Sequence, residues 1–106
     1  MSGTTSDRDD PGLSIINPSG MQETYLVLSE EERAKGFVRP VLTTYRHLTC
    51  GVNTTMGRSI AETYARHPAF YGGTFCVSCG THFPVGAVGD FVWVVDGVTT
   101  DMKVGT

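Results

Sequence analysis

The chain has 106 residues, of which 18% are charged, and its formal net charge at pH 7 is −3. This length accommodates one domain, and no apolar run reaches the roughly 18 residues that a membrane-spanning helix requires. The N-terminus also lacks the apolar stretch of a secretory signal peptide. We therefore expect a cytoplasmic protein that does not associate with a membrane.

The charge is distributed unevenly along the chain. Residues 1–32 contain seven acidic side chains and one arginine, a net charge of −6, whereas residues 33–67 contain six basic side chains and one glutamate, a net +5. Residues 68–106 carry −2. An acidic protein repels nucleic acid at long range, but the middle segment could still present a basic face to it.

Residues 1–20 are rich in Ser, Thr, Gly, Asp and Pro and contain few large apolar residues. This composition predicts a flexible acidic tail, followed by a single domain over residues 21–106. A domain this small buries little apolar surface and commonly needs a disulfide or a metal ion for stability.

The first expected element of the domain is a strand over residues 24–28, which are mostly aromatic and β-branched. Ser29 and Glu32 form a capping box that starts a short helix, and Gly36 ends this helix. The chain is then expected to continue as an edge strand over residues 37–45, interrupted by Pro40.

A longer helix is expected from Thr54 or Thr55 to about His67. Apolar residues recur there with helical spacing, and Pro68 disfavours helical geometry at the residue before it. Short strands are expected at residues 74–76 and 82–85. Residues 91–95 and 98–104 alternate in polarity around an Asp-Gly pair, which is typical of a tight β-hairpin.

The cysteines lie in two clusters with the same spacing. The first reads HxxCG, with His47 and Cys50, and the second reads CxxCG, with Cys76 and Cys79. Two soft ligands three positions apart, followed by a glycine that tolerates positive φ, are typical of a zinc knuckle. We therefore predict that the four side chains bind one structural Zn²⁺, whose binding free energy contributes to folding.

Alternatives remain for this site. His82, three residues after Cys79, is a competing fourth ligand in place of His47, or else a strand residue beside the site. Iron also binds such ligand sets, although zinc is the default for tetrahedral sulfur and nitrogen donors. A thioredoxin-like redox use of the CxxC motif is disfavoured, because no helix follows it and Cys50 is left over.

A zinc deaminase is excluded by the motifs. That class pairs PCxxC with an upstream HxE whose glutamate moves protons. Here Phe75 precedes Cys76, and neither His47 nor His67 has a glutamate two residues later.

The region around residues 62–76 is dense in aromatic side chains and lies close in sequence to Arg58 and Arg66. These rings are interpreted first as the core around the metal, and alternatively as a stacking platform for bases. The candidate nucleic-acid-binding residues are Arg39, Arg46, Arg58 and Arg66, whose simpler interpretation is solvation.

Much of the chain resembles short zinc-ribbon-like proteins of tailed bacteriophages and prophages. The resemblance covers about residues 22–93 and is carried by YRHLTCG, by TTMGRSIAETYARHPAFYGGTFCVSCGTHFPVG and by the upstream ETYLVLSEEERAKGFVRPV. It implies His47, Cys50, Cys76 and Cys79 as ligands, and a location in the host cytoplasm or the virion. It implies no reaction.

The sequence thus predicts an α+β fold: a small antiparallel β-sheet with one helix between two zinc knuckles, similar to a zinc ribbon. For function it favours a non-enzymatic, phage-encoded interaction module that binds a host or virion protein. The alternative is a nucleic-acid-binding zinc protein that uses the basic segment 33–67. An enzyme is disfavoured, because four protein ligands leave no open coordination position.

Overall fold

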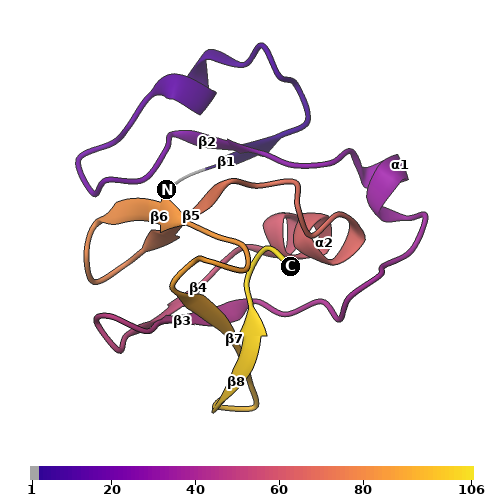
Figure 1. Cartoon of the computed structure of the whole chain (residues 1–106). Helices are drawn as coiled ribbons and strands as arrows, with labels where there is room; N and C mark the ends of the chain where they lie inside the picture. Colours follow the sequence, from indigo (N-terminus) through magenta and orange to yellow (C-terminus); the bar gives the residue numbers. More distant parts are fainter. Residues whose placement is uncertain (1–2) are drawn as a thin grey trace.

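A computed structural model describes residues 3–106 of the chain. It contains one four-stranded sheet, two two-stranded sheets and two short α-helices, arranged as Figure 1 shows. The predicted α+β class is therefore confirmed. No helix within residues 3–106 combines the length and the apolar character needed to cross a bilayer.

The largest sheet has the strand order β4-β3-β7-β8, with every neighbouring pair antiparallel. Its strands are β3 (Thr44–His47), β4 (Asn53–Thr55), β7 (Phe91–Val95) and β8 (Val98–Lys103). Asp96 and Gly97 connect β7 to β8 with φ angles of 51° and 79°. A type I′ turn requires positive φ at both positions, so the predicted hairpin is confirmed.

Helix α2 (Arg58–Arg66) follows β4 in the chain and leads to a second hairpin, formed by β5 (Gly73–Cys76) and β6 (Thr81–Pro84), which contacts the sheet through β4. The helix ends before Pro68, as predicted, but it begins later than expected. Its N-cap is Gly57, which offers no side-chain cap. The two threonines that were expected to cap it belong instead to β4, which pairs with β3.

The strand predicted over residues 37–45 forms only from Thr44 onward. The backbone N–H groups of Val38 and Arg39 donate instead to the carbonyl of Ala65, at 2.8 and 3.1 Å. These bonds satisfy a carbonyl at the C-terminal end of α2 that has no partner within the helix. Pro40 has no N–H to offer a sheet. The segment therefore packs on the end of the helix.

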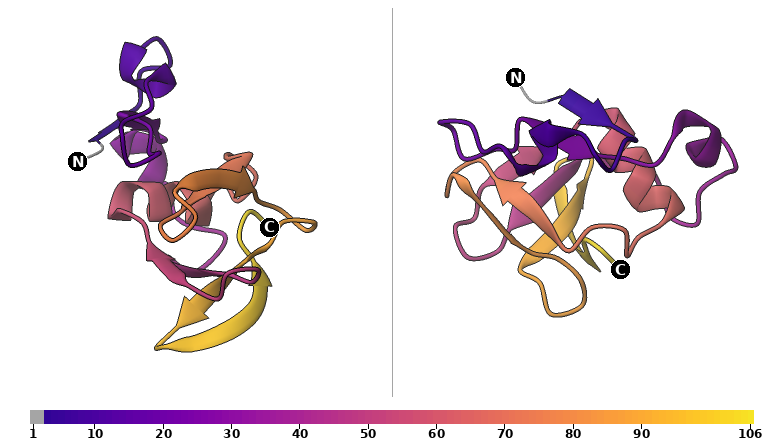
Figure 2. Two further views of the ribbon diagram at one scale, coloured as in Figure 1. Left: turned by 90° about the vertical axis from the view of Figure 1, so that its left-hand side faces the viewer. Right: turned by 90° about the horizontal axis from the view of Figure 1, so that it is seen from above.

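The N-terminal segment forms a separate layer over the rest of the molecule, as both views in Figure 2 show. It comprises β1 (Gly3–Thr5), the 3₁₀ turn η1 (Pro11–Ser14) and β2 (Thr24–Leu26), and β1 pairs with β2 in parallel. The segment thus carries more structure than a flexible tail over residues 1–20 implies. Residues 1–2 of that predicted tail lie outside the described residues.

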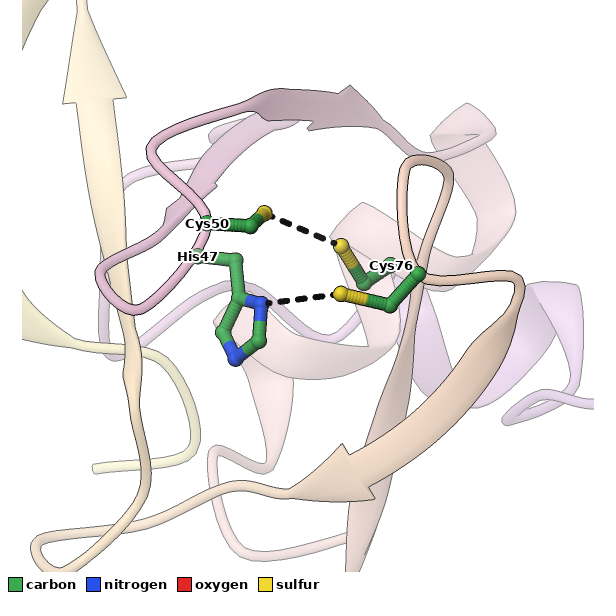
Figure 3. Close-up of side chains that lie close together, drawn as sticks. His47, Cys50 and Cys76 are labelled. Atoms are coloured by element: carbon green, nitrogen blue, oxygen red, sulfur yellow. Dashed lines mark hydrogen bonds between the residues drawn. The ribbon is translucent and has the colours of Figure 1, made fainter.

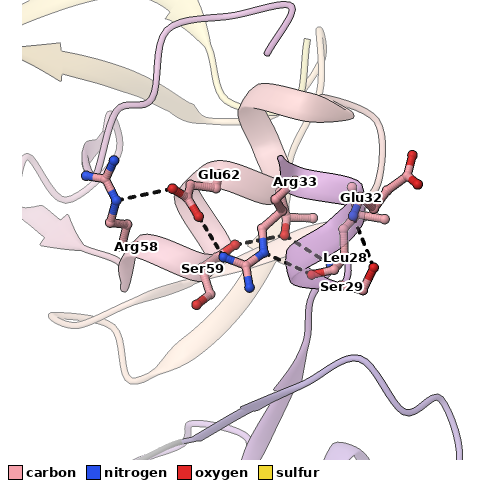
Figure 4. Close-up of polar contacts among 8 residues, drawn as sticks. Leu28, Ser29, Glu32, Arg33, Arg58, Ser59 and Glu62 are labelled. Atoms are coloured by element: carbon pink, nitrogen blue, oxygen red, sulfur yellow. Dashed lines mark hydrogen bonds and ion pairs between the residues drawn. The ribbon is translucent and has the colours of Figure 1, made fainter. Parts of the chain in front are cut away.

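The short helix α1 (Glu30–Arg33) confirms the predicted N-cap, because the Ser29 hydroxyl accepts a hydrogen bond from the backbone N–H of Glu32 at 3.2 Å. The Glu32 carboxylate, the other half of the predicted capping box, pairs with Lys35 and Arg66 instead. Arg33, the last residue of α1, connects this helix to α2, because its Nη1 atom lies 2.6 Å from a carboxylate oxygen of Glu62 (Figure 4). The other oxygen of Glu62 lies 3.2 Å from Arg58 Nε. One half-buried carboxylate therefore joins the two helices.

The core is built from side chains of β3, α2, β5 and β7. Tyr45 is 2% exposed and packs edge-to-face on Phe91 and on Trp93, with ring centroids 5.4 and 6.3 Å apart. Trp93, the only tryptophan in the chain, also packs edge-to-face on Tyr64 at 5.6 Å. The buried core residues are Tyr45, Met56, Ala61, Tyr64, Cys76, Phe91 and Val104.

The N-terminal layer contacts the turn after Cys79, where Gly20 lies against Gly80. Gly20 has a φ of +89°, and a Cβ built on it would lie 1.9 Å from the carbonyl oxygen of Gly80. Gly36 has a φ of +112° but open space around its Cβ position. A side chain at Gly20 or at Gly36 would therefore be strained by the positive φ, but only a side chain at Gly20 would also collide with a neighbouring segment.

We expect Gly36→Ala to destabilise the protein by about 1–2 kcal/mol through φ strain alone. Gly20→Ala should cost on the order of 1–3 kcal/mol more, because the layer must move off Gly80. Urea unfolding measures both costs. Hydrogen exchange should show loss of protection in β1 and β2 for Gly20→Ala only. Equal behaviour of the two variants would mean that this contact does not hold the layer in place.

Candidate metal centre

The first cysteine cluster forms a turn between β3 and β4. His47 is the last residue of β3, and its carbonyl accepts a hydrogen bond from the N–H of Gly51 at 2.8 Å. Gly51 has a φ of +72°, which a residue with a side chain resists. The chain reverses there and returns as β4. His47 and Cys50 therefore project from one tight turn.

The second cluster repeats this geometry between β5 and β6. Cys76 is the last residue of β5, and its carbonyl accepts a hydrogen bond from the N–H of Gly80 at 2.9 Å, where φ is +68°. The two turns are also joined directly, because the N–H of Val77 donates to the hydroxyl of Thr54 at 3.1 Å. The common spacing in the sequence thus reflects a common backbone conformation.

The two turns bring all four predicted ligands together. The ligand atoms of His47, Cys50, Cys76 and Cys79 all lie within 4.8 Å of one another. The Sγ atoms of Cys50 and Cys76 are 3.6 Å apart, and Cys79 Sγ lies 3.7 Å from Nδ1 of His47. Figure 3 shows the side chains of one turn facing those of the other. All three thiols are free, and this group of four could hold a metal ion.

The His47 ring is held on every side. It is 3% exposed and lies between the rings of Phe83 and Phe91, with centroids 4.6 and 4.7 Å away. Its Nδ1 faces Cys79, and its Nε2 lies 3.1 Å from a carboxylate oxygen of Asp90. A carboxylate at the second nitrogen of a ligating histidine fixes the tautomer and the orientation of the ring.

Asp90 is itself fixed by the turn that carries His47. Both the backbone N–H and the hydroxyl of Thr49 donate to the same oxygen of Asp90 that faces the imidazole. The Thr49 hydroxyl is the largest cause lowering the pKa of this carboxyl, and the backbone N–H of Thr49 and the nearby His47 add to that effect. Sequence patterns did not indicate Asp90, since it lies 43 residues after His47 in a loop.

The thiols differ in their surroundings. Burial raises the pKa of the Cys76 thiol, but hydrogen bonds from the backbone of Cys79 and from the neighbouring thiols outweigh it, so the net pKa lies below the ordinary value. The side-chain contact with Cys76 is the main cause that raises the pKa of Cys79 to about 11. A negative charge on one thiolate disfavours ionisation of the neighbouring thiols, and a central cation would relieve this repulsion.

His82 lies outside the group of four. Its Nε2 is 2.8 Å from the hydroxyl of Tyr25, and its ring packs edge-to-face on Phe75. Burial lowers the pKa of His82, which favours the neutral ring. The alternative fourth ligand thus connects β6 to the N-terminal layer instead.

Two of the four candidate arginines, Arg58 and Arg66, lie at the two ends of α2, and three of the four have polar partners within the chain. Arg58 pairs with Glu62, and Arg66 has an Nη2 3.7 Å from a carboxylate oxygen of Glu32. The guanidinium of Arg39 donates to the carbonyl of Thr106 at 3.3 Å. The fourth, Arg46, lies on β3. Carboxylates therefore offset the charge of Arg58 and Arg66 in part, since Glu62 also pairs with Arg33 and Glu32 also pairs with Lys35.

The contact between His47 and Asp90 leads to a prediction about affinity. Asp90→Asn should weaken the binding of Co²⁺, used as an optical probe of thiolate coordination, by about 10- to 100-fold. Asp96→Asn, in the β7–β8 turn, removes the same charge away from the site and should leave the affinity unchanged. Competition against a chelator measures both. Equal affinities would show that Asp90 does not support His47 as a ligand.

No family model, curated protein or solved structure matches this chain. The resemblance to short phage zinc-ribbon-like proteins therefore stays a prediction.

Proposed function

We propose that His47, Cys50, Cys76 and Cys79 hold one structural Zn²⁺, and that the protein is a small non-enzymatic module that binds another protein. The observation that carries this proposal is the convergence of the four ligand atoms from two similar turns. Residues 26 positions apart in the sequence meet there without a disulfide.

Two separations between donor atoms match those of a tetrahedral zinc site. Zn–S bonds of about 2.3 Å and Zn–N bonds of about 2.0–2.1 Å, at tetrahedral angles, separate neighbouring donor atoms by roughly 3.5–3.8 Å. The separations of 3.6 Å between Cys50 and Cys76, and of 3.7 Å between Cys79 and His47, fall in this range. Three thiolates and one imidazole are soft ligands, which favour zinc over magnesium or calcium.

A structural role follows from the number of ligands and from their surroundings. Four protein donors fill a tetrahedral shell and leave no position for a substrate or a reactive water. Cys76 belongs to the buried core whereas Cys79 is exposed, so the ion would join the central sheet to the β5–β6 hairpin at the edge of the core. The ion would thereby stabilise the fold.

Exposed apolar side chains on the two turns support the protein-binding part of the proposal. Leu48 and Val52, on the first turn, are 46% and 37% exposed, and Val77, on the second, is 57% exposed. Apolar side chains gathered on neighbouring loops are typical of protein-binding surfaces. Following the resemblance to phage proteins, we propose a host or virion protein as the partner, in the host cytoplasm or the virion.

Metal analysis tests the first half of the proposal. The purified protein should contain one Zn²⁺ per chain, and a strong chelator should unfold it, because metal binding and folding are coupled. His47→Ala should lower the affinity for Zn²⁺ by at least about 100-fold, and its matched control His82→Ala should retain the metal. Elemental analysis and circular dichroism give these results. A metal-free protein that stays folded would refute the proposal.

Cross-linking and affinity capture from the cells that produce the protein test the second half. A specific partner should be retained by the wild type and by Val98→Asp, in the exposed β7–β8 turn, but should be lost with the double variant Leu48→Asp/Val77→Asp. If nucleic acid is recovered instead, with affinity that falls steeply as salt rises and is lost on charge reversal at Arg58 and Arg66, the alternative function replaces this one.

A further inference from the structure

A cavity of about 150 Å³ lies where the N-terminal layer meets the core. The layer contributes residues of β1 and Tyr25 of β2, and the core contributes side chains of β3, α2 and β5. Five aromatic residues contribute to the lining: Tyr25, Tyr45, Tyr64, Tyr71 and Phe75. An apolar cavity of this size is large enough for a benzene ring.

Most polar groups of the lining are already occupied. The hydroxyl of Tyr71 donates to the carbonyl of Leu26 at 2.6 Å, and the hydroxyl of Tyr45 donates to the carbonyl of Phe75. The Thr74 hydroxyl donates to that of Tyr45 at 3.1 Å. No charged side chain contributes to the described lining. The cavity therefore disfavours an ion and favours an uncharged molecule.

Tyr64 is the exception. Its side chain is 4% exposed, yet its buried hydroxyl has no hydrogen-bond partner among the residues that the structure describes. Burial raises the pKa of this phenol strongly, an effect that the nearby Thr74 hydroxyl only partly offsets. The group therefore remains protonated and can donate a hydrogen bond, and Tyr64 is one of the residues that line the cavity. Buried donors without a partner are rare in folded proteins.

We propose that this cavity binds a small uncharged aromatic molecule that carries one hydrogen-bond acceptor, such as a carbonyl oxygen. The ring would pack against the surrounding tyrosines and Phe75, which favour edge-to-face and offset contacts. The acceptor would receive a hydrogen bond from the Tyr64 hydroxyl. This site is separate from the metal centre and does not depend on the proposed protein-binding function.

A pair of matched probes isolates the hydroxyl. Acetophenone and α-methylstyrene have nearly the same shape, but only the first has a carbonyl oxygen. Both should shift the methyl NMR resonances of Met21 and Met56, which line the cavity. The resonance of Met102, which lies on β8 and does not line it, should stay unchanged. Titration of the metal-loaded protein then gives both dissociation constants.

Tyr64→Phe should weaken the binding of acetophenone by about 3- to 10-fold, the usual effect of losing one hydrogen bond. It should leave the affinity for α-methylstyrene unchanged. The second probe thus also reports whether the variant is folded. Tyr71→Phe is the matched control, because that hydroxyl is already bonded to Leu26. It should leave the ratio of the two affinities unaltered.

Two results would overturn the proposal. If neither probe shifts the methyl resonances of Met21 and Met56 at millimolar concentration, the cavity does not accept an aromatic ligand. If Tyr64→Phe weakens the binding of both probes equally, the hydroxyl donates its hydrogen bond to another group of the protein, such as Thr74, and does not recognise the ligand.

Discussion

The meeting of the two cysteine-bearing turns is the contact on which the other layers depend. Each turn ends a strand of a different sheet, so their apposition sets how the β5–β6 hairpin lies against the central sheet. Two hydrogen bonds between the same elements reinforce it: Val77 to Thr54, and Tyr45 to the carbonyl of Phe75. The helix and the N-terminal layer then pack on a framework that these contacts define.

The spacing of the cysteines and histidine was enough to predict which side chains meet. A turn of this kind is local: a glycine with positive φ, placed after the second ligand, gives the same backbone in both clusters. The β7–β8 hairpin was predictable for a similar reason, since Asp96 and Gly97 tolerate the dihedral angles of its turn. The features that could be predicted are therefore those whose backbone conformation is set by residues close together in the sequence.

Features that depend on distant partners were not predictable. Residues 37–43 have strand-like composition but bond to the end of α2, and β4 arises because the first turn sends the chain back along β3. Asp90 supports His47 from a loop that no spacing rule connects to it. The N-terminal segment is polar in composition, yet β1 pairs with β2. Each case is a tertiary contact that overrides local preference.

The position of Trp93 has a practical consequence. Its indole touches Tyr45, whose hydroxyl is bonded to the strand that ends in Cys76, and it also touches Tyr64, on the wall of the cavity. The one tryptophan of the chain is therefore adjacent to both regions. Its emission and its energy transfer from the tyrosines can follow refolding in real time, with no label attached to the chain.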